Sequence, residues 1–116
     1  MVAIIGILAA VAIPLYQAYK SAFEVQLSGG GTVSNSELGY VPSSLTTGGP
    51  ATNIGLANPD GSGHIQVTMG GNAHPILAGI ILRFERDSSG TWACEIDKSA
   101  ASQWKDAYRP AGCSVL

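Results

Sequence analysis

The sequence predicts an α+β fold, in which an apolar N-terminal helix precedes a small head rich in β-strands. Residues 1–13 carry no polar side chain, which favours a helix that is covered on all sides. Residues 64–96 hold runs typical of strands, separated by turn-forming residues. Two cysteines, Cys94 and Cys113, stand near the end of the chain, where a covalent link would strengthen a thin core. We therefore expect two units, a helix over 1–28 and a head over 29–116.

The first segment is apolar on every face until Gln17. As one helix, Met1 to Tyr19 would span about 28 Å, close to the hydrocarbon thickness of a bilayer. Something apolar must surround it, either lipid or other protein. A cleaved signal peptide is the alternative, because Ala10-Val-Ala12 resembles a cleavage site, but no basic stretch precedes the apolar run. Gly6 and Pro14 both weaken a helix, so we expect it to bend or partly unwind between them.

A helical pattern continues after Pro14. Tyr16, Tyr19, Phe23 and Leu27 recur at helical spacing and predict one apolar stripe facing the head. The run Ser28-Gly-Gly-Gly31 then predicts the end of the helix, because glycine is the usual residue just beyond a helix C-terminus.

The remaining chain predicts a loop followed by an antiparallel meander. Residues 32–59 lack periodicity and indicate a long loop with a weak strand at 53–57. Clearer strands are expected at 64–69, 76–86 and 91–96. In the last of these, Trp92, Cys94 and Ile96 alternate with more exposed positions, so this face should be buried.

The cysteine spacing fits neither a CxxC redox pair nor a four-ligand zinc site. One disulfide is the simplest interpretation, and it would place the protein in an oxidising compartment. Two buried free thiols are the alternative.

Composition argues against several functions. Charged residues make up 12% of the chain and the net charge is -2, so no basic patch is available for nucleic acid. His64 and His74, the only histidines, lack a carboxylate or cysteine at ligand spacing, which argues against a metal site. No serine stands in a nucleophile-elbow pattern and no glycine run forms a phosphate loop. We expect neither enzymatic activity nor a cofactor.

Two stretches resemble a known family. Residues 3–19, AIIGILAAVAIPLYQAY, resemble the N-terminal helix of type IV pilins of the Pseudomonas and Neisseria kind. Near the other end, VTMGG at 67–71, IILRF at 80–84, GTWAC at 90–94 and PAGC at 110–113 are similar to the sheet and C-terminal loop of pseudomonad pilins.

The resemblance implies the architecture of a type IV pilin. It comprises a long N-terminal helix, an αβ-loop over about Gly29 to Asn53, a four-stranded antiparallel sheet, and a disulfide loop closed by Cys94 and Cys113. In pili of this family the apolar helices bundle at the filament axis, and the stretch matching Gly6 to Pro14 tends to lose helicity. We expect the filament-core side chains to be Val2, Ile4, Ile5, Ile7, Leu8, Val11 and Ile13.

Two features depart from the family pattern. The chain shows neither the short basic leader nor the Phe-Thr-Leu-Ile-Glu type of mature start, and the segment after Pro14 is short. A natural short helix or a deliberate truncation would explain both. The pattern nevertheless predicts a structural subunit of a type IV pilus, a methylated surface fimbrium that resides in the inner membrane before assembly and serves adhesion or twitching motility. The alternative is a membrane-anchored monomer, either a minor pilin or a competence-type binding subunit.

The loop between the cysteines is the candidate contact region. Trp104 and Tyr108 lie four residues apart beside Lys105 and Arg109, a mixture suited to a host glycan or an abiotic surface. Pseudomonad pilins use this loop for adhesion, which supports the same role here. The alternative is that Trp104 packs the loop onto the sheet.

Overall fold

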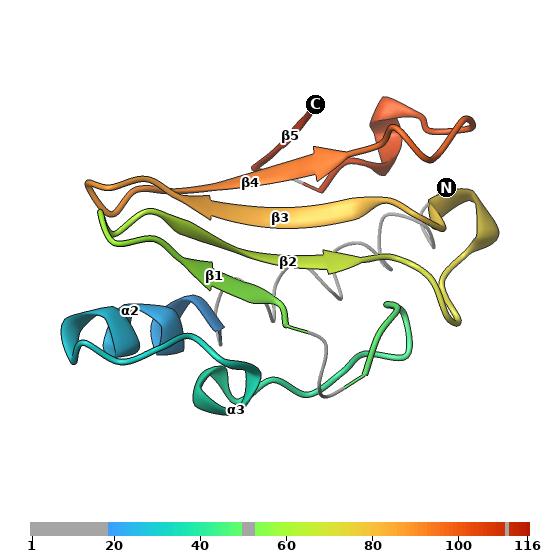
Figure 1. Ribbon diagram of the computed structural model, residues 1–116. Helices are drawn as coiled ribbons and strands as arrows, with labels where there is room; N and C mark the ends of the chain where they lie inside the picture. Colours follow the sequence, from blue (N-terminus) through green and yellow to red (C-terminus); the bar gives the residue numbers. More distant parts are fainter. Residues whose placement is uncertain (1–18, 50–52, 111) are drawn as a thin grey trace.

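A five-stranded sheet forms the body of the head, and short helices lie to one side of it (Figure 1). The computed structural model describes residues 19–49, 53–110 and 112–116. The strands stand in the order β1-β2-β3-β4-β5. Their bounds are β1 Gly55–Ala57, β2 Gly63–Thr68, β3 Ile81–Arg86, β4 Trp92–Asp97 and β5 Cys113–Val115.

The first four strands form the predicted antiparallel meander. The fifth strand was not predicted, and it runs parallel to β4 at the edge of the sheet. It is too short to show an alternating pattern in the sequence, and the disulfide brings it beside β4. The α+β fold with a C-terminal disulfide loop is thus confirmed, with one strand more than expected.

One face of the sheet is buried because apolar residues alternate along each central strand. Ile65 on β2 is paired with Phe84 on β3, and Phe84 with Cys94 on β4. All three are buried, as are Leu82 and its partner Ile96. The predicted alternation of Trp92, Cys94 and Ile96 is therefore confirmed, with Trp92 half-buried at the margin of the core.

Helix α2, Lys20–Ser28, packs its apolar stripe on this core. Phe23 is fully buried, and Tyr19 and Leu27 are partly buried against the same cluster. The helix ends where the three glycines begin, as predicted. Tyr16, Gly6, Pro14 and the expected filament-core side chains lie outside the described residues. Within the described part of the chain, no helix is long and apolar enough to cross a membrane.

The loop after α2 contains a helical turn that the sequence analysis missed. Helix α3 covers Asn35–Leu38 and begins at Ser34, whose hydroxyl accepts a hydrogen bond from the Glu37 amide. The Glu37 carboxylate in turn accepts from the Ser34 hydroxyl at 2.6 Å. This hydrogen bond is the main reason why the pKa of Glu37 is lowered. The signal was Ser34-x-x-Glu37, a serine followed three residues later by glutamate at a helix start.

The strand expected over 76–86 is correct only from Ile81 onward. Pro75–Leu77 instead forms a 3-10 turn, labelled η2, and His74 Nδ1 accepts a hydrogen bond from the Ile76 amide. Gly79 follows at φ +87°, a conformation that ends any extended run. The continuous apolar composition of 76–82 therefore reflects a turn that buries Leu77, followed by a strand, rather than one long strand.

Candidate functional site: the disulfide loop and the helix anchor

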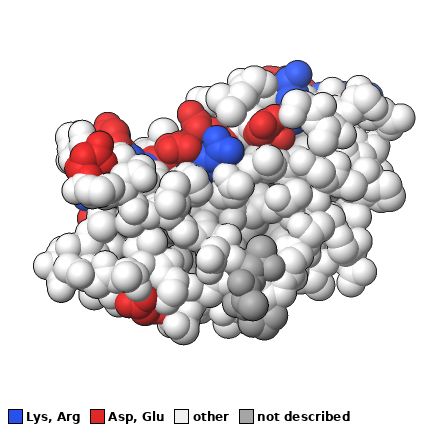
Figure 2. Space-filling model, in the orientation of Figure 1, with Lys and Arg blue, Asp and Glu red and all other residues white. Residues whose placement is uncertain are grey.

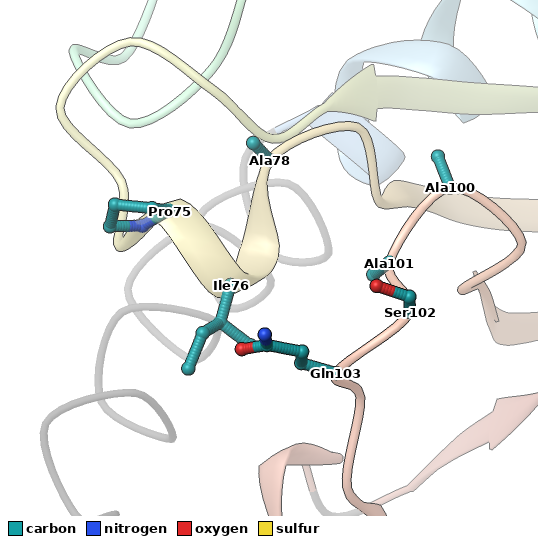
Figure 3. Close-up of a pocket in the computed structure, with 7 residues that line it drawn as sticks. All are labelled: Pro75, Ile76, Ala78, Ala100, Ala101, Ser102 and Gln103. Atoms are coloured by element: carbon teal, nitrogen blue, oxygen red, sulfur yellow. The ribbon is translucent and has the colours of Figure 1, made fainter.

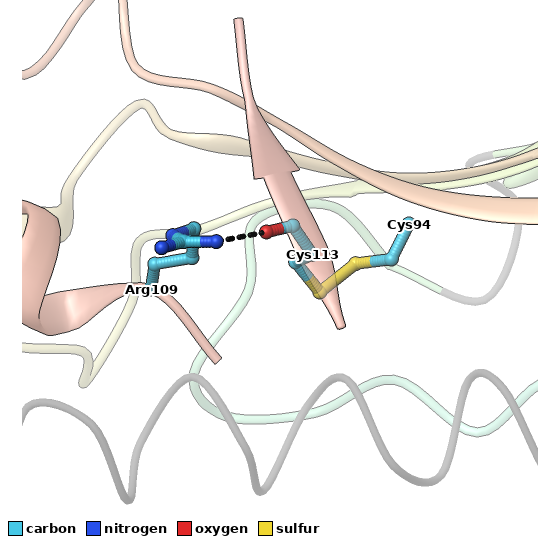
Figure 4. Close-up of a disulfide and its surroundings, with 3 residues drawn as sticks. All are labelled: Cys94, Arg109 and Cys113. Atoms are coloured by element: carbon cyan, nitrogen blue, oxygen red, sulfur yellow. Dashed lines mark hydrogen bonds between the residues drawn. A yellow bond between two sulfur atoms is a disulfide. The ribbon is translucent and has the colours of Figure 1, made fainter. Parts of the chain in front are cut away.

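The disulfide loop, residues 94–113, is closed by a bond between Cys94 and Cys113 (Figure 4). The two residues are register partners on β4 and β5, with Cα atoms 4.5 Å apart. Both are buried, so the bond lies within the core rather than at the surface. In the chain-entropy model a loop of this size stabilises the fold by about 3 kcal/mol. The predicted disulfide is confirmed, and the free-thiol alternative is wrong.

Arg109 holds the base of the loop. Its Nη1 donates to the Cys113 carbonyl oxygen at 3.2 Å, as Figure 4 shows. On the loop side its Nε lies 3.3 Å from Asp106 Oδ1, an ion pair between largely exposed groups. Solvent screening leaves such a pair with little net stability, so the bond to the strand is the more important contact. Arg109 therefore has a structural role as well as an exposed surface.

The two aromatic residues of the loop pack against each other. The Trp104 and Tyr108 rings meet edge to face, with centroids 5.6 Å apart. Tyr108 is only 3% exposed, because the 3-10 turn η3, Asp106–Tyr108, places it in the core. Trp104 is half-buried against the same core, while Lys105 is exposed. Of the four residues expected at a contact surface, Lys105 and Arg109 are thus exposed, Trp104 in part, and the Tyr108 ring is covered.

A shallow groove lies between η2 and the disulfide loop (Figure 3). Gly79 permits this close approach, because a Cβ at that position would lie 2.9 Å from the Ala100 Cβ. None of the described residues that line the groove is ionisable, so these residues offer no general acid or base for catalysis. Its lining residues are Pro75, Ile76, Ala78, Ala100, Ala101, Ser102 and Gln103.

The helix anchor is a second cluster, formed by Phe23, Glu24, Arg86 and Trp92. Glu24 Oε1 accepts from Arg86 Nε at 2.6 Å and from Trp92 Nε1 at 2.8 Å. The Phe23 and Trp92 rings meet edge to face at 5.1 Å. The cluster joins α2 to β3 and β4, where Arg86 and Trp92 are cross-strand partners.

The electrostatics of the anchor favour the charged forms of both partners. The Arg86 hydrogen bond lowers the pKa of Glu24, with a smaller contribution from Trp92, and burial opposes the shift. The pKa of Arg86 is raised, chiefly by its hydrogen bond to Glu24. Arg86 also donates to the Gly61 carbonyl oxygen, so the same side chain links α2 to the turn between β1 and β2.

A glycine makes the close approach of α2 possible. A Cβ on Gly63 would lie 2.8 Å from the tip of the Phe23 ring and 2.2 Å from the Leu56 carbonyl oxygen. Real Cβ atoms do not occur at such distances. Gly63 therefore lets Phe23 reach the sheet.

The two histidines belong neither to the disulfide loop nor to the helix anchor. His64 lies on β2 opposite Glu85, where partial burial lowers its pKa. His74 precedes η2 and caps it. Among the residues that the structure describes, no three His, Cys, Asp or Glu side chains gather in a way that could hold a metal ion.

An apolar N-terminal segment, an antiparallel sheet and a C-terminal disulfide loop define a class of bacterial filament proteins. The family model for the pilin, a bacterial filament protein, matches residues 9–114. The chain belongs to the pilin family.

Its relatives carry the names of type IV and fimbrial proteins. It is 36% identical to fimbrial protein Q of Moraxella bovis, over 97% of this chain and 90% of the relative. It is 36% identical to fimbrial protein EcpB of Eikenella corrodens, over 100% of this chain and 91% of the relative. It is 33% identical to the type IV major alpha-pilin of Moraxella bovis, over 97% of this chain and 89% of the relative. The resemblance to type IV pilins is confirmed.

The matched region of the relatives is longer than this chain. The first two alignments extend over 141 and 146 positions, whereas the chain has 116 residues. Residues present in the relatives are therefore missing within the matched region here.

Proposed function

We propose that this chain is the repeating structural subunit of a bacterial surface filament. The observation that carries the proposal is the extent of the family match, which runs from within the apolar segment to the end of the disulfide loop. The relatives are named fimbrial proteins and a type IV major pilin, which supports a filament built from copies of the chain itself.

Assembly proceeds through the apolar N-terminal segment. Residues 1–13 have no polar side chain, so copies that bundle this segment remove apolar surface from water. Each Met, Val, Ile or Leu side chain contributes about 1.5 to 3 kcal/mol if fully buried, so the eight of them in this segment can drive multivalent association. Before assembly the same segment resides in the inner membrane, because a helix that continues from Met1 to Tyr19 would span about 28 Å, close to the hydrocarbon thickness of a bilayer.

The rival function is a membrane-anchored monomer, such as a minor pilin or a competence-type subunit. The same apolar segment would serve that function by staying in lipid. A DNA-binding role needs a basic stripe, and the six Lys and Arg residues of this chain are outnumbered by eight Asp and Glu. The charge balance therefore favours the filament over a DNA-uptake subunit.

An aspartate in place of Leu8 tests the assembly role. The spacing of Ile5, Leu8 and Val11 would place them on one side of a helix, so a charge at Leu8 would be buried in the filament core without a partner. Electron microscopy of Leu8→Asp should find no filaments, while the disulfide and the thermal unfolding of the head stay unchanged. The matched control is Val41→Asp, because Val41 is 73% exposed on the head. Normal filaments from Leu8→Asp would refute assembly through this segment.

The exposed surface of the disulfide loop is proposed to contact surfaces outside the filament. Lys105 and Arg109 offer charge-assisted hydrogen bonds beside the accessible part of Trp104. The disulfide and Arg109 fix the loop, which limits the conformational entropy lost on contact. A host glycan or an abiotic surface is the expected partner, and adhesion or motility the expected use.

A further inference from the structure

The β1 edge of the sheet has free backbone groups. Ile54 accepts from the Gln66 amide at 2.8 Å, and the Asn58 amide donates to Ser62 at 2.8 Å. Ile54, Leu56 and Asn58 therefore face β2, and the intervening Gly55 and Ala57 direct their N–H and C=O groups away from it. Among the described residues, these groups have no hydrogen-bond partner.

A groove runs along this edge. Its lining comes from the start of the αβ-loop and from β1, and none of it is charged: Gly31, Thr32, Val33, Ser34, Asn53, Gly55, Leu56 and Ala57. The free edge ends just before β1, because the Ile54 amide already donates to Oδ1 of the buried Asn35 side chain at 3.0 Å. The exposed Glu37 carboxylate borders the groove, because it accepts from the hydroxyls of the lining residues Thr32 and Ser34. An extended segment could pair with Gly55 and Ala57 beside that acidic group.

On the opposite edge, β5, some of the outward backbone N–H and C=O groups have hydrogen-bond partners and others do not. The Cys113 amide donates to the Pro110 carbonyl oxygen at 3.2 Å, and the Cys113 carbonyl oxygen accepts from Arg109. The Leu116 amide donates to Ile96, so Ser114 and Leu116 face β4. Val115 then directs its N–H and C=O outward, and they have no partner among the described residues.

The two edges match in chemistry. β1 and β5 contain no charged residue, although charge is the usual way of protecting a sheet edge. Large exposed apolar side chains are few in the described part of the chain, and the two leucines among them, Leu56 and Leu116, lie one beside each edge. Figure 2 shows most of the charged side chains gathered over the part of this face that carries β3 and β4, with one acidic group at the opposite, lower edge of the view.

We propose that the β1 edge of one subunit receives the β5 edge of a second copy, so that their sheets join. The inference rests on the proposed function, because it names a contact between filament subunits. An interface between two different edges is heterologous, and repeated heterologous contacts give an open filament when the rotation between neighbouring copies does not close a ring. The three-residue strands offer few hydrogen bonds, so the contact becomes strong only when the filament holds the edges together.

Cross-linking tests the pairing. The variant Leu56→Cys/Leu116→Cys places one thiol beside each edge, and a short bismaleimide should join neighbouring copies into a ladder of oligomers. The control Val41→Cys/Leu116→Cys moves one thiol to a site that is more exposed than Leu56, 73% against 47%, and that no edge strand adjoins, and it should give no ladder. The inference is wrong if the edge pair gives no ladder or the control gives the same one.

Lysine substitutions test how much the contact between the two edges contributes to the stability of the filament. Leu56→Lys and Leu116→Lys should each raise the protein concentration needed for filaments about tenfold, because a charge would be buried against the joining edge. Val41→Lys should leave that concentration unchanged, and all three heads should melt at the temperature of the unaltered protein. Equal effects of all three substitutions would overturn the inference.

Electron microscopy of the unaltered protein separates this inference from the proposed function. Filaments without an edge ladder refute edge pairing alone. A ladder without filaments refutes the proposed function but supports pairing of the edges in solution. The absence of both refutes both.

Discussion

Truncating Phe23 should detach α2 from the head. The Phe23 side chain is fully buried, so Phe23→Ala loses its burial and leaves a cavity between α2 and the sheet. Changes of this kind cost about 3 to 5 kcal/mol. Part of that cost is the lost edge-to-face contact with Trp92, which contributes roughly 0.5 to 1.5 kcal/mol beyond the burial of area.

Such a loss is large for a domain of this size. Small domains have a free energy of unfolding of about 5 to 15 kcal/mol, so one substitution would remove about a fifth of it or more. Each kcal/mol lowers the melting temperature by about 4 to 8 °C, which predicts a fall of at least roughly 12 °C.

The fall in the melting temperature of Phe23→Ala can be measured by circular dichroism during thermal unfolding in mild detergent, with the disulfide kept oxidised. Near-ultraviolet signals should weaken at the same time, because Trp92 loses its fixed neighbour. Val25→Ala is the matched control on the same helix: Val25 is 66% exposed, and the change should cost less than about 0.5 kcal/mol. Equal effects of the two substitutions would show that α2 is not anchored through Phe23.

Three further outcomes are expected. The intact mass should rise by about two hydrogens when the bond between Cys94 and Cys113 is reduced, and an unchanged mass would contradict the disulfide. The reduced protein should melt at a lower temperature, since the disulfide contributes about 3 kcal/mol to the free energy of unfolding. The lowered pKa of Glu24 gives stability that is present above its ordinary value of 4.5 and lost as the pH falls through the lower folded value. Glu24→Gln should therefore flatten the acid side of the stability profile, whereas an unaltered profile would mean that the Arg86 contact is not formed. Trp104→Ala should leave filament number unchanged and weaken attachment to epithelial or abiotic surfaces; normal attachment with a stability loss of several kcal/mol would make it a packing residue only.

The sheet was largely predictable because its signal is local. Alternation placed strands at 64–69 and 91–96, and the structure has them at Gly63–Thr68 and Trp92–Asp97. The end of α2 was equally clear, since three glycines follow Ser28. Where the apolar run was continuous, between Ile76 and Leu82, periodicity could not separate an apolar turn from a strand.

The helix anchor was not predictable, because it depends on distant residues. Glu24 and Arg86 are 62 positions apart, and only the pairing of β3 with β4 brings Arg86 beside Trp92 and both within reach of the helix. β5 was not predicted for a similar reason, because its place beside β4 depends on the covalent bond between Cys94 and Cys113.

The disulfide loop shows the same limit at short range. Its aromatic residues were recognised, but spacing alone could not decide which ring points inward. The turn Asp106–Tyr108 decides it, because the Tyr108 amide donates to Lys105 at 2.9 Å and the ring enters the core. Exposure of Lys105 and Arg109 follows from the same turn.

Electron microscopy of the purified chain, followed by helical reconstruction, tests the central claim most directly. The account predicts uniform filaments with residues 1–13 at the axis and the disulfide loop on the outer surface, where an antibody against the loop should decorate them along their length. Discrete monomers that stay in detergent or lipid at every concentration, with the same folded head, would contradict it and support a membrane-anchored subunit.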